Sequence, residues 1–428
     1  MNYYSLNNKN HSVSFQEAVV QGLAADRGLY FPSEINPLPS TFYDNIEQLS
    51  HEEIAYQIIQ QFVGNEIPEA DLKQIIAETL CFDFPCVAVE ENIFSLELYH
   101  GPTMAFKDVG ARFMSRCLGY FNRNSDKKVT VLVATSGDTG GAVASGFLGV
   151  KGVEVVILYP SEKVSDIQER QLTTLGQNIT ALEVDGVFDD CQDMVKKAFL
   201  DDSLQHKNLT SANSINIARW LPQMFYFFFA YQQLKKHHKP LIVSCPSGNF
   251  GNICAGILAK KLGLPIAHFV AATNANDTVP QFLVKGIYEP KPSVPTISNA
   301  MDVGNPSNFI RIQEMYHNDL NEFNKDFSSY TYNDEETKEA MKSIYAHSGY
   351  IAEPHGAVGY LGLKKEMALH PETIGVFLET AHPIKFLDVV EPVLNTKLPI
   401  PTQIDSVLGK EKHSIKISNY EGLKNFLN

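Results

Sequence analysis

The sequence is poor in cysteine and in basic residues. Six of its 428 residues are cysteines, and no two of them form a C-x-x-C pair. A disulfide framework or a zinc module is therefore not predicted, and reduced, buried thiols are the simplest interpretation. Lysine and arginine number 35 against 49 aspartates and glutamates, which gives a net charge of −14. This charge argues against a nucleic acid or an anionic membrane surface as partner.

Long hydrophobic runs are also missing. The densest apolar stretch, residues 224–231, is far shorter than the roughly 20 residues that cross a bilayer. The N-terminus begins Met1-Asn2-Tyr3 and lacks a basic segment followed by an apolar run, so no secretory signal is predicted. No histidine or cysteine spacing typical of a metal site occurs, and we predict none. We expect a soluble, cytoplasmic protein.

What the chain does have is a large apolar content and a change of pattern near residue 93. Hydrophobic residues make up 44% of the sequence, enough for two or three domains with sizeable cores. Helical periodicity covers 15–23, 53–63 and 70–80, which predicts a small, mainly helical N-terminal domain over residues 1–92.

Residues 93–428 alternate between strand-like and helix-like segments. Apolar runs of strand length occupy 129–134, 153–158, 179–184, 241–244, 266–271 and 374–378. Helical segments between them include 165–175, 190–199 and 253–262. This order is typical of an α/β doubly wound fold, in which a mainly parallel sheet is covered by helices on both faces. Ligands of such folds bind at the carboxyl ends of the strands.

Two glycine-rich turns stand at such strand ends. The first reads Thr135-Ser136-Gly137-Asp138-Thr139-Gly140-Gly141, and the second reads Ser247-Gly248-Asn249-Phe250-Gly251-Asn252. Glycine allows a turn that directs several backbone N–H groups to one point, and a following helix favours an anion there. Neither turn fits a dinucleotide or Walker pattern. An ordinary strand-to-helix turn explains either one alone, but two on one protein suggest two bound anionic groups.

A third feature is the segment Tyr99-His100-Gly101-Pro102-Thr103-Met104-Ala105-Phe106-Lys107-Asp108. Gly-Pro interrupts the chain, and we expect Asp108 to cap a helix that runs to about Tyr120. An apolar environment disfavours the charged form of a lysine, so Lys107 is a candidate nucleophile for a Schiff base. An exposed lysine beside a helix cap is the alternative that this segment alone favours.

The segment His100–Asp108 resembles the cofactor-lysine motif of threonine synthases, which are fold-type II pyridoxal-phosphate enzymes. Further similarity lies in 13–32, in both glycine-rich turns, in Ala212-Asn213-Ser214-Ile215-Asn216 with Arg219, in 300–304 and in Glu379-Thr380-Ala381-His382-Pro383. Together these motifs span about residues 1–390. The resemblance implies a two-lobed catalytic region over 93–428, with a small lobe near 112–235 and a large lobe formed by the remainder.

The same resemblance implies roles for individual residues. Lys107 would form the Schiff base with pyridoxal 5'-phosphate and move protons. The cofactor phosphate would lie on the backbone of Gly248, Asn249, Phe250, Gly251 and Asn252, and Thr380 would face the pyridine nitrogen. Thr135, Ser136 and Thr139 would line the substrate side, with Thr139 also assisting catalysis. Asn213, Ser214 and Arg219 would bind the substrate phosphate.

The implied reaction is conversion of O-phospho-L-homoserine and water to L-threonine and phosphate, by γ-elimination and β-addition, in a monomer or homodimer. Three alternatives stay open at this point. A dehydratase or β-replacement enzyme of the same cofactor family would release a different product. A paralogue without activity would have no need of Lys107, Thr380 and Arg219 together. A nicotinamide oxidoreductase would require the missing dinucleotide motif.

Overall fold

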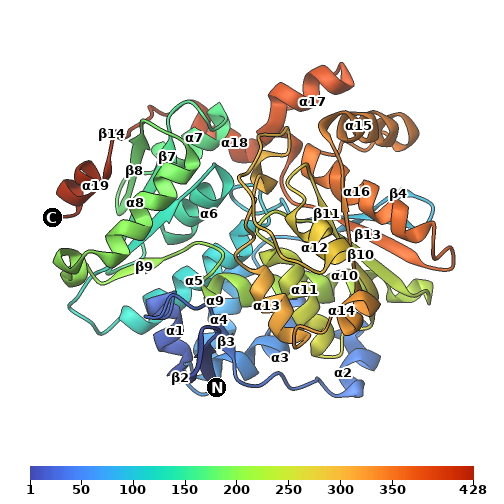
Figure 1. The fold of residues 1–428 in the computed structure, drawn as a ribbon, viewed down its shortest axis with the longest axis horizontal. Helices are drawn as coiled ribbons and strands as arrows, with labels where there is room; N and C mark the ends of the chain where they lie inside the picture. The colour runs from blue at the N-terminus through green and yellow to red at the C-terminus, as the bar shows by residue number, and fades with distance from the viewer.

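Two parallel sheets, each in its own lobe, stand above an N-terminal unit in the computed structural model (Figure 1). The structure describes residues 1–428, apart from the side chain of Ser406. We call the six-stranded sheet with its helices the large lobe and the five-stranded sheet with its helices the small lobe. No helix in the described part of the chain is both long and apolar enough to cross a membrane.

The large lobe is built on a sheet with the order β12-β11-β10-β13-β5-β4, parallel except at β4. Its strands are β4 (Cys86–Glu90), β5 (Ile93–Glu97), β10 (Leu241–Pro246), β11 (Ile266–Thr273), β12 (Phe327–Thr331) and β13 (Ile374–Glu379). Consecutive residues of the central strands are buried on opposite faces: Ile242 belongs to one apolar cluster and Val243 to another. Burial on both faces explains why these strands appear in the sequence as continuous apolar runs.

The small lobe repeats this arrangement on an all-parallel sheet with the order β14-β8-β7-β6-β9. Its strands are β6 (Val129–Ala134), β7 (Val153–Pro160), β8 (Ile179–Val184), β9 (Leu209–Ser211) and β14 (Ile415–Ile417). In β6, Val131 and Leu132 again belong to different apolar clusters. The predicted doubly wound α/β class is therefore confirmed.

Helices cover the faces of both sheets. Those of the small lobe are α5 (Lys107–Asn122), α6 (Asp138–Phe147), α7 (Asp166–Thr173), α8 (Phe188–Leu200), α18 (Thr402–Leu408) and α19 (Tyr420–Leu427). Those of the large lobe are α10 (Phe225–Leu234), α11 (Gly251–Lys261), α12 (Thr278–Lys285), α13 (Phe309–Met315), α14 (Leu320–Asp326), α15 (Asp334–Ser348), α16 (Pro354–Met367) and α17 (Leu387–Leu394). The short helix α9 (Ile217–Trp220) lies between α5 and α11.

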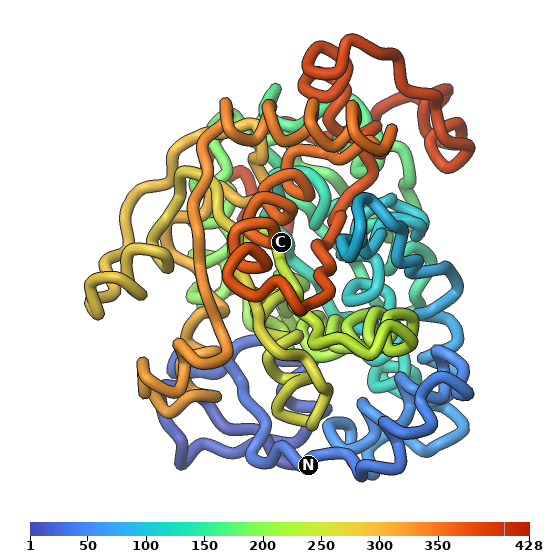
Figure 2. The backbone as a smooth tube through the Cα atoms, turned by 90° about the vertical axis from the view of Figure 1, so that its right-hand side faces the viewer, coloured from blue at the N-terminus to red at the C-terminus, as the bar shows by residue number. Residues whose placement is uncertain are grey.

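The N-terminal unit forms one end of the molecule in both views (Figures 1 and 2). Its helices are α1 (Phe15–Gln21), α2 (Ser40–Asn45), α3 (His51–Val63) and α4 (Glu69–Thr79). Capping boxes start α1 at Ser14 and α3 at Ser50. An antiparallel sheet of β1 (Asn2–Ser5), β2 (Asn8–Ser14) and β3 (Tyr30–Pro32) accompanies these helices and was not predicted. The strands are short, and most side chains of β2 are exposed, so no apolar run marks them.

The C-terminal residues connect the two lobes. α17 packs against α15 in the large lobe, and the chain then crosses to the small lobe, where α18 lies on α7. β14 adds to the sheet edge beside β8, and α19 packs on α8, so that the C-terminus lies beside the small lobe (Figure 1).

Candidate active site

Lys107 and Thr380 lie side by side because two segments pair as antiparallel chains. Ala105 and Ala381 form a β-bridge, the Phe106 amide donates to the Thr380 carbonyl at 2.9 Å, and the His382 amide donates to the Met104 carbonyl at 3.1 Å. Lys107 is the first residue of α5, and Thr380 follows β13 directly. The pairing brings together two residues that the sequence places far apart.

The prediction that Asp108 caps the helix is wrong. α5 starts two residues earlier than such a cap would place it, with Phe106 at the cap position and no side-chain capping bond. The Asp108 carboxylate is buried and turns back to accept from the Thr103 amide at 2.9 Å and from the Thr103 hydroxyl at 2.5 Å. Asp108 therefore closes the turn that precedes Lys107 rather than starting a helix. A sequence pattern cannot distinguish these two uses of an aspartate.

The second glycine-rich turn forms a cradle of backbone amides at the end of β10. The amides of Gly248, Asn249 and Phe250 donate to no acceptor within the described chain, and α11 begins immediately afterwards at Gly251. Phe250 has a left-handed backbone with φ of 60°. Unpaired amides before a helix N-terminus fit a phosphate dianion. The residues present therefore fit the phosphate of pyridoxal 5'-phosphate.

Gly248 allows this cradle to approach its neighbour. A Cβ atom at Gly248 would lie 2.6 Å from the Cα atom of Met301 and 3.0 Å from the carbonyl oxygen of Ala300. Both are backbone atoms, so a side chain here would displace one loop or the other. The approach holds the cradle against residues 300–301, which the sequence analysis had connected with the same family pattern.

The amine of Lys107 lies near charged groups and is largely shielded from water. Its side chain is 17% exposed, and its Nζ atom lies 3.9 Å from Oδ2 of Asp138. Burial lowers the pKa of Lys107, the Asp138 carboxylate raises it, and the cations Lys385 and Arg219 lower it further. The net direction is downward, as the sequence predicted for an amine in an apolar setting.

The first glycine-rich turn is organised differently. The Thr135 hydroxyl accepts from the amides of Gly137 at 3.0 Å and Gly140 at 2.9 Å, and it is buried. This hydroxyl therefore closes its own turn, which is the structural role weighed for the loop in the sequence. Ser136 and Thr139 are half-buried, and their hydroxyls have no hydrogen-bond partner in the described chain. These two hydroxyls are free to meet a ligand.

Of the residues expected at the substrate phosphate, Arg219 and Asn213 bond to the backbone around β9 and β6, whereas Ser214 bonds to the amide cradle. Arg219 is buried, donates from Nη1 to the Ala212 carbonyl at 2.7 Å and leaves Nε without a partner in the described chain. Burial lowers its pKa to about 10, so the guanidinium stays charged at neutral pH. Asn213 donates to the Ala134 carbonyl at the end of β6 at 3.1 Å. The Ser214 hydroxyl instead accepts from Asn249 of the amide cradle at 2.6 Å.

Behind Thr380 lies a buried carboxyl network. The Thr380 hydroxyl is 3.5 Å from Oε1 of Glu353, and Oε2 of Glu353 contacts Nδ1 of His355 at 2.5 Å. The Ala300 amide donates to Nε2 of His355, so Nδ1 carries the proton and donates to Glu353. Burial and the Glu353 charge raise the pKa of Glu379 well above its ordinary value. A hydrogen-bond chain thus joins residues 300–301 to Thr380.

Sequence reasoning missed Asp138 and Lys385 as members of the site. Asp138 stands inside a turn that was singled out, but only its neighbours were assigned roles. Lys385 lies in the 3₁₀ helix η6 (Pro383–Phe386), just after the last family motif. Lys385 could have been noticed in the sequence because it is, like Lys107, a lysine in a mostly apolar segment, and it lies close after Thr380.

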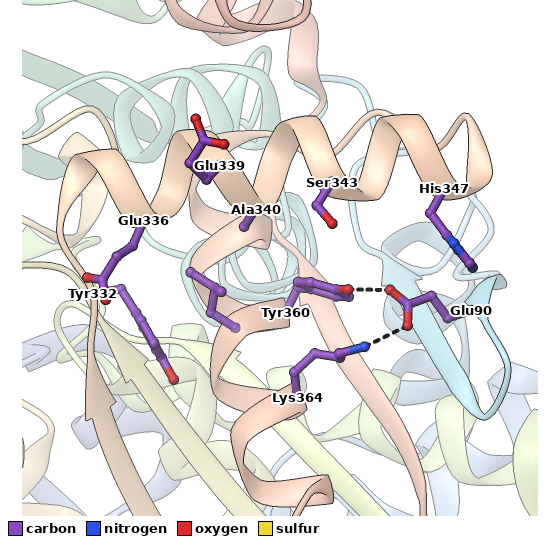
Figure 3. A pocket seen from close by; sticks show the side chains of 10 residues that line it. Glu90, Tyr332, Glu336, Glu339, Ala340, Ser343, His347, Tyr360 and Lys364 are labelled. Carbon is purple, nitrogen blue, oxygen red and sulfur yellow. Dashed lines mark hydrogen bonds and ion pairs between the residues drawn. The ribbon is translucent and has the colours of Figure 1, made fainter.

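One surface groove shares no lining residue with the predicted site. It has a volume of about 680 Å³ and lies between α15, α16 and Glu90 of β4 (Figure 3). Lys364 contacts Glu90 at 2.8 Å across it, and Tyr360 also donates to Glu90. None of the residues predicted for the site lines it. The groove is therefore separate from the predicted cofactor and substrate residues.

Comparison with known proteins decides the family. The family described as "Pyridoxal-phosphate dependent enzyme" matches residues 72–379, "Threonine synthase N terminus" matches 2–80, and "Threonine synthase, C-terminal" matches 356–427. The chain belongs to the threonine synthase family of pyridoxal-phosphate-dependent enzymes. A threonine synthase of Serratia marcescens is 45% identical over 403 residues, which are 94% of this chain and 92% of that protein.

Solved structures of threonine synthases show the same fold. The Escherichia coli enzyme superposes with a TM-score of 0.93 at 42% identity, and covers 100% of this chain and 99% of its own. A pyridoxal-phosphate-bound threonine synthase from Brucella melitensis gives 0.94 at 32% identity, with 100% and 98% covered. The predicted family, fold class, lyase activity and cofactor are confirmed. The roles of single residues and the domain boundaries stay predictions.

Proposed function

We propose that this threonine synthase converts O-phospho-L-homoserine and water to L-threonine and inorganic phosphate. The observation that carries the proposal is the pairing of residues 104–106 with 380–382, which sets the buried amine of Lys107 beside Thr380. Two separate anion-binding features support the choice of a phosphorylated substrate. One is the amide cradle at Gly248–Phe250, and the other is the buried guanidinium of Arg219 with its unpaired Nε.

The cofactor would be held by residues from the large lobe and from α5. The amides of the cradle would bind its phosphate, Lys107 would hold its aldehyde group, and Thr380 would lie on the side of its pyridine nitrogen. When bound, pyridoxal 5'-phosphate would supply the electron sink for carbanions at the α- and β-carbons of the substrate. A hydroxyl opposite the ring nitrogen leaves that nitrogen neutral, whereas a carboxylate would hold a proton on it.

Lys107 would also carry the protons of the reaction. Once its Nζ is free, the amine would take the α-proton and then a β-proton, which allows phosphate to leave the γ-carbon, and it would later return protons to the γ- and α-carbons. Burial lowers the pKa of Lys107, which favours the neutral amine, the form that accepts a proton. The free hydroxyls of Ser136 and Thr139 lie on the small-lobe side, where Thr139 would position the water that adds at the β-carbon.

The phosphate that leaves the γ-carbon would be stabilised by Arg219. Its buried guanidinium remains charged, and a charge in a water-poor site interacts more strongly with a developing dianion than it would in water. Asn213, which follows β9 and donates to the carbonyl at the end of β6, would contribute its side-chain amide nearby. Ser214 is bonded to the cofactor cradle, so its part would be to connect the two phosphate sites.

The decisive experiment measures phosphate and threonine released from O-phospho-L-homoserine by the wild type and by Lys107→Ala. We expect equal amounts of both products from the wild type, and a loss of about 10³-fold or more in Lys107→Ala. Release of a 2-oxo acid from serine or threonine, with no phosphate released from O-phospho-L-homoserine, would contradict the proposal. That result would favour a dehydratase of the same fold.

We further infer that the enzyme acts in the cytoplasm as a monomer or homodimer, and that its N-terminal domain spans residues 1–92 with catalytic lobes in 93–428. The small lobe would lie near 112–235, except that α10 packs in the large lobe and the C-terminal elements α18, β14 and α19 pack on the small lobe. Sedimentation velocity at several concentrations checks the assembly. Limited proteolysis followed by mass determination checks the boundary near residue 92.

A further inference from the structure

A buried ion pair crosses the boundary between the two lobes beside Lys107. Nζ of Lys385, which follows β13 of the large lobe, lies 2.7 Å from Oδ1 of Asp138, which starts α6 of the small lobe. The Lys385 side chain has no exposed surface, and that of Asp138 is 5% exposed. Burying two charges is unfavourable unless their remaining bonds are satisfied, so this pair requires an explanation.

One oxygen of Asp138 is fully bonded and the other is not. Oδ1 contacts Lys385 and accepts from Nε2 of Gln168 at 3.0 Å. Oδ2 has no hydrogen-bond partner in the described chain, and it faces Nζ of Lys107 at 3.9 Å. The unbonded oxygen is directed at the reactive amine.

The surroundings fix the direction of this carboxylate. Lys385 also donates to the Thr103 carbonyl at 2.8 Å, which anchors it to the turn before Lys107. Gly137 has φ of 138°, and a Cβ atom there would lie 2.5 Å from the Gln168 side chain. Only glycine leaves Gln168 the space it needs to reach Asp138.

We propose that Lys385 is a positioning residue that shares the carboxylate of Asp138 with the amine of Lys107, and so limits how strongly this carboxylate favours the protonated amine. The inference rests on the assignment of Lys107 in the proposed function and adds the pair that controls the charge of its free amine. We call Asp138 and Lys385 the inter-lobe clamp. Because its members belong to different lobes, separation of the lobes would break the contact between Lys385 and Asp138.

The clamp acts on Lys107 in two opposite ways. The charged groups that act on the amine are Asp138 from α6, Lys385 from η6, Arg219 from α9 and Glu353 before α16. The Asp138 carboxylate favours the protonated amine, and Lys385 disfavours it both directly and by occupying the carboxylate. The carboxylate itself stays ionised, because Lys385 and Lys107 outweigh the effect of burial and hold its pKa below the ordinary range.

The test is the pH dependence of Lys107 acetylation in the cofactor-free enzyme, followed residue by residue by mass spectrometry with acetic anhydride. Asp138→Asn removes the attraction, so its midpoint should fall by about one pH unit relative to wild type. Lys385→Met leaves the carboxylate to Lys107 alone, so its midpoint should rise by about the same amount. Lys385→Arg should return the midpoint toward the wild-type value. Lys364→Met, which removes a lysine from the surface groove, should not move it.

Midpoints that move in the same direction in Asp138→Asn and Lys385→Met, or that do not move, would overturn the proposal. If Lys385→Met does not fold, the double variant Asp138→Asn/Lys385→Met replaces it, since it leaves no unpaired carboxylate. Its midpoint should then lie above that of Asp138→Asn, and equality of the two would exclude any action of Lys385. Failure of the proposed function is seen separately, as a wild type that releases no phosphate.

Discussion

The two glycine-rich turns have similar sequences and equivalent positions, yet they present different chemistry. The turn after β10 in the large lobe offers unpaired backbone amides to an anion. The turn after β6 in the small lobe uses the Thr135 hydroxyl to bond its own amides, and it presents the carboxylate of Asp138 instead. The difference shows that a glycine pattern fixes the turn, while one buried hydroxyl decides whether the amides are free.

The largest effect on stability is expected from a substitution that disrupts the small-lobe turn. Thr135→Val keeps the shape of the side chain but leaves the amides of Gly137 and Gly140 without an acceptor. Each buried donor left unpaired destabilises a protein by about 1–3 kcal/mol, so we expect a loss of about 2–4 kcal/mol in the free energy of unfolding. Urea denaturation of the cofactor-free enzyme measures it.

The matched control is Ser247→Ala in the other turn. The Ser247 hydroxyl donates to the Cys245 carbonyl at 2.9 Å and accepts from no amide of its turn. Its removal should therefore reduce stability by about 1 kcal/mol. Equal losses in the two variants would mean that the turns are built alike.

The next largest effect is expected on cofactor binding, and it tests the role of the large-lobe turn. Gly248→Ala places a Cβ atom against the backbone of Met301, and crowding of this kind is unfavourable by about 2 kcal/mol, or about 30-fold in an equilibrium constant. We expect the dissociation constant of pyridoxal 5'-phosphate to rise by that factor, measured by equilibrium dialysis. Gly251→Ala meets only the side chains of Asn308 and Ser214, at 3.3 Å or more, and should weaken binding less. The reverse order would place the phosphate away from Gly248.

A smaller effect is expected on the pH dependence of stability, through Glu379 in the large lobe. The pKa of Glu379 is raised in the folded state, so the carboxyl contributes its full stability below the unfolded pKa and loses it as pH rises toward the folded pKa. Glu379→Gln removes this loss, because an amide does not ionise. We expect the variant to be more stable than wild type by about 1 kcal/mol at pH 8, with no difference near pH 4. Thermal unfolding at both pH values checks it, and a wild type more stable at pH 8 would contradict it.

The smallest effect lies outside both turns. Glu339 lines the surface groove and pairs with Lys342 at 2.7 Å, with its side chain 71% exposed. Exposed ion pairs contribute under about 0.5 kcal/mol on average, so Glu339→Gln should change neither stability nor threonine formation measurably. A change in kcat or KM would make the groove part of the catalytic apparatus.

The core strands and the cofactor motifs could be predicted from the sequence, whereas the side-chain network could not. The apolar run of β6 appears at Val129–Ala134 because both its faces are buried, and the Lys107 and Thr380 motifs carry a family pattern. β14 is three residues long and half exposed, so it left no signal. Asp138 and Lys385 meet only because the lobes face each other, which no local pattern encodes.

The C-terminal crossing has a consequence for the order in which the protein can fold during synthesis. β14 completes the small sheet, and Ile417, Leu423 and Leu427 cover the same apolar cluster as Leu182 and Met194. These covering residues are synthesised only after the large-lobe elements from α10 to α17. The nascent small lobe therefore keeps an uncovered sheet edge and an apolar surface while the large lobe is being made.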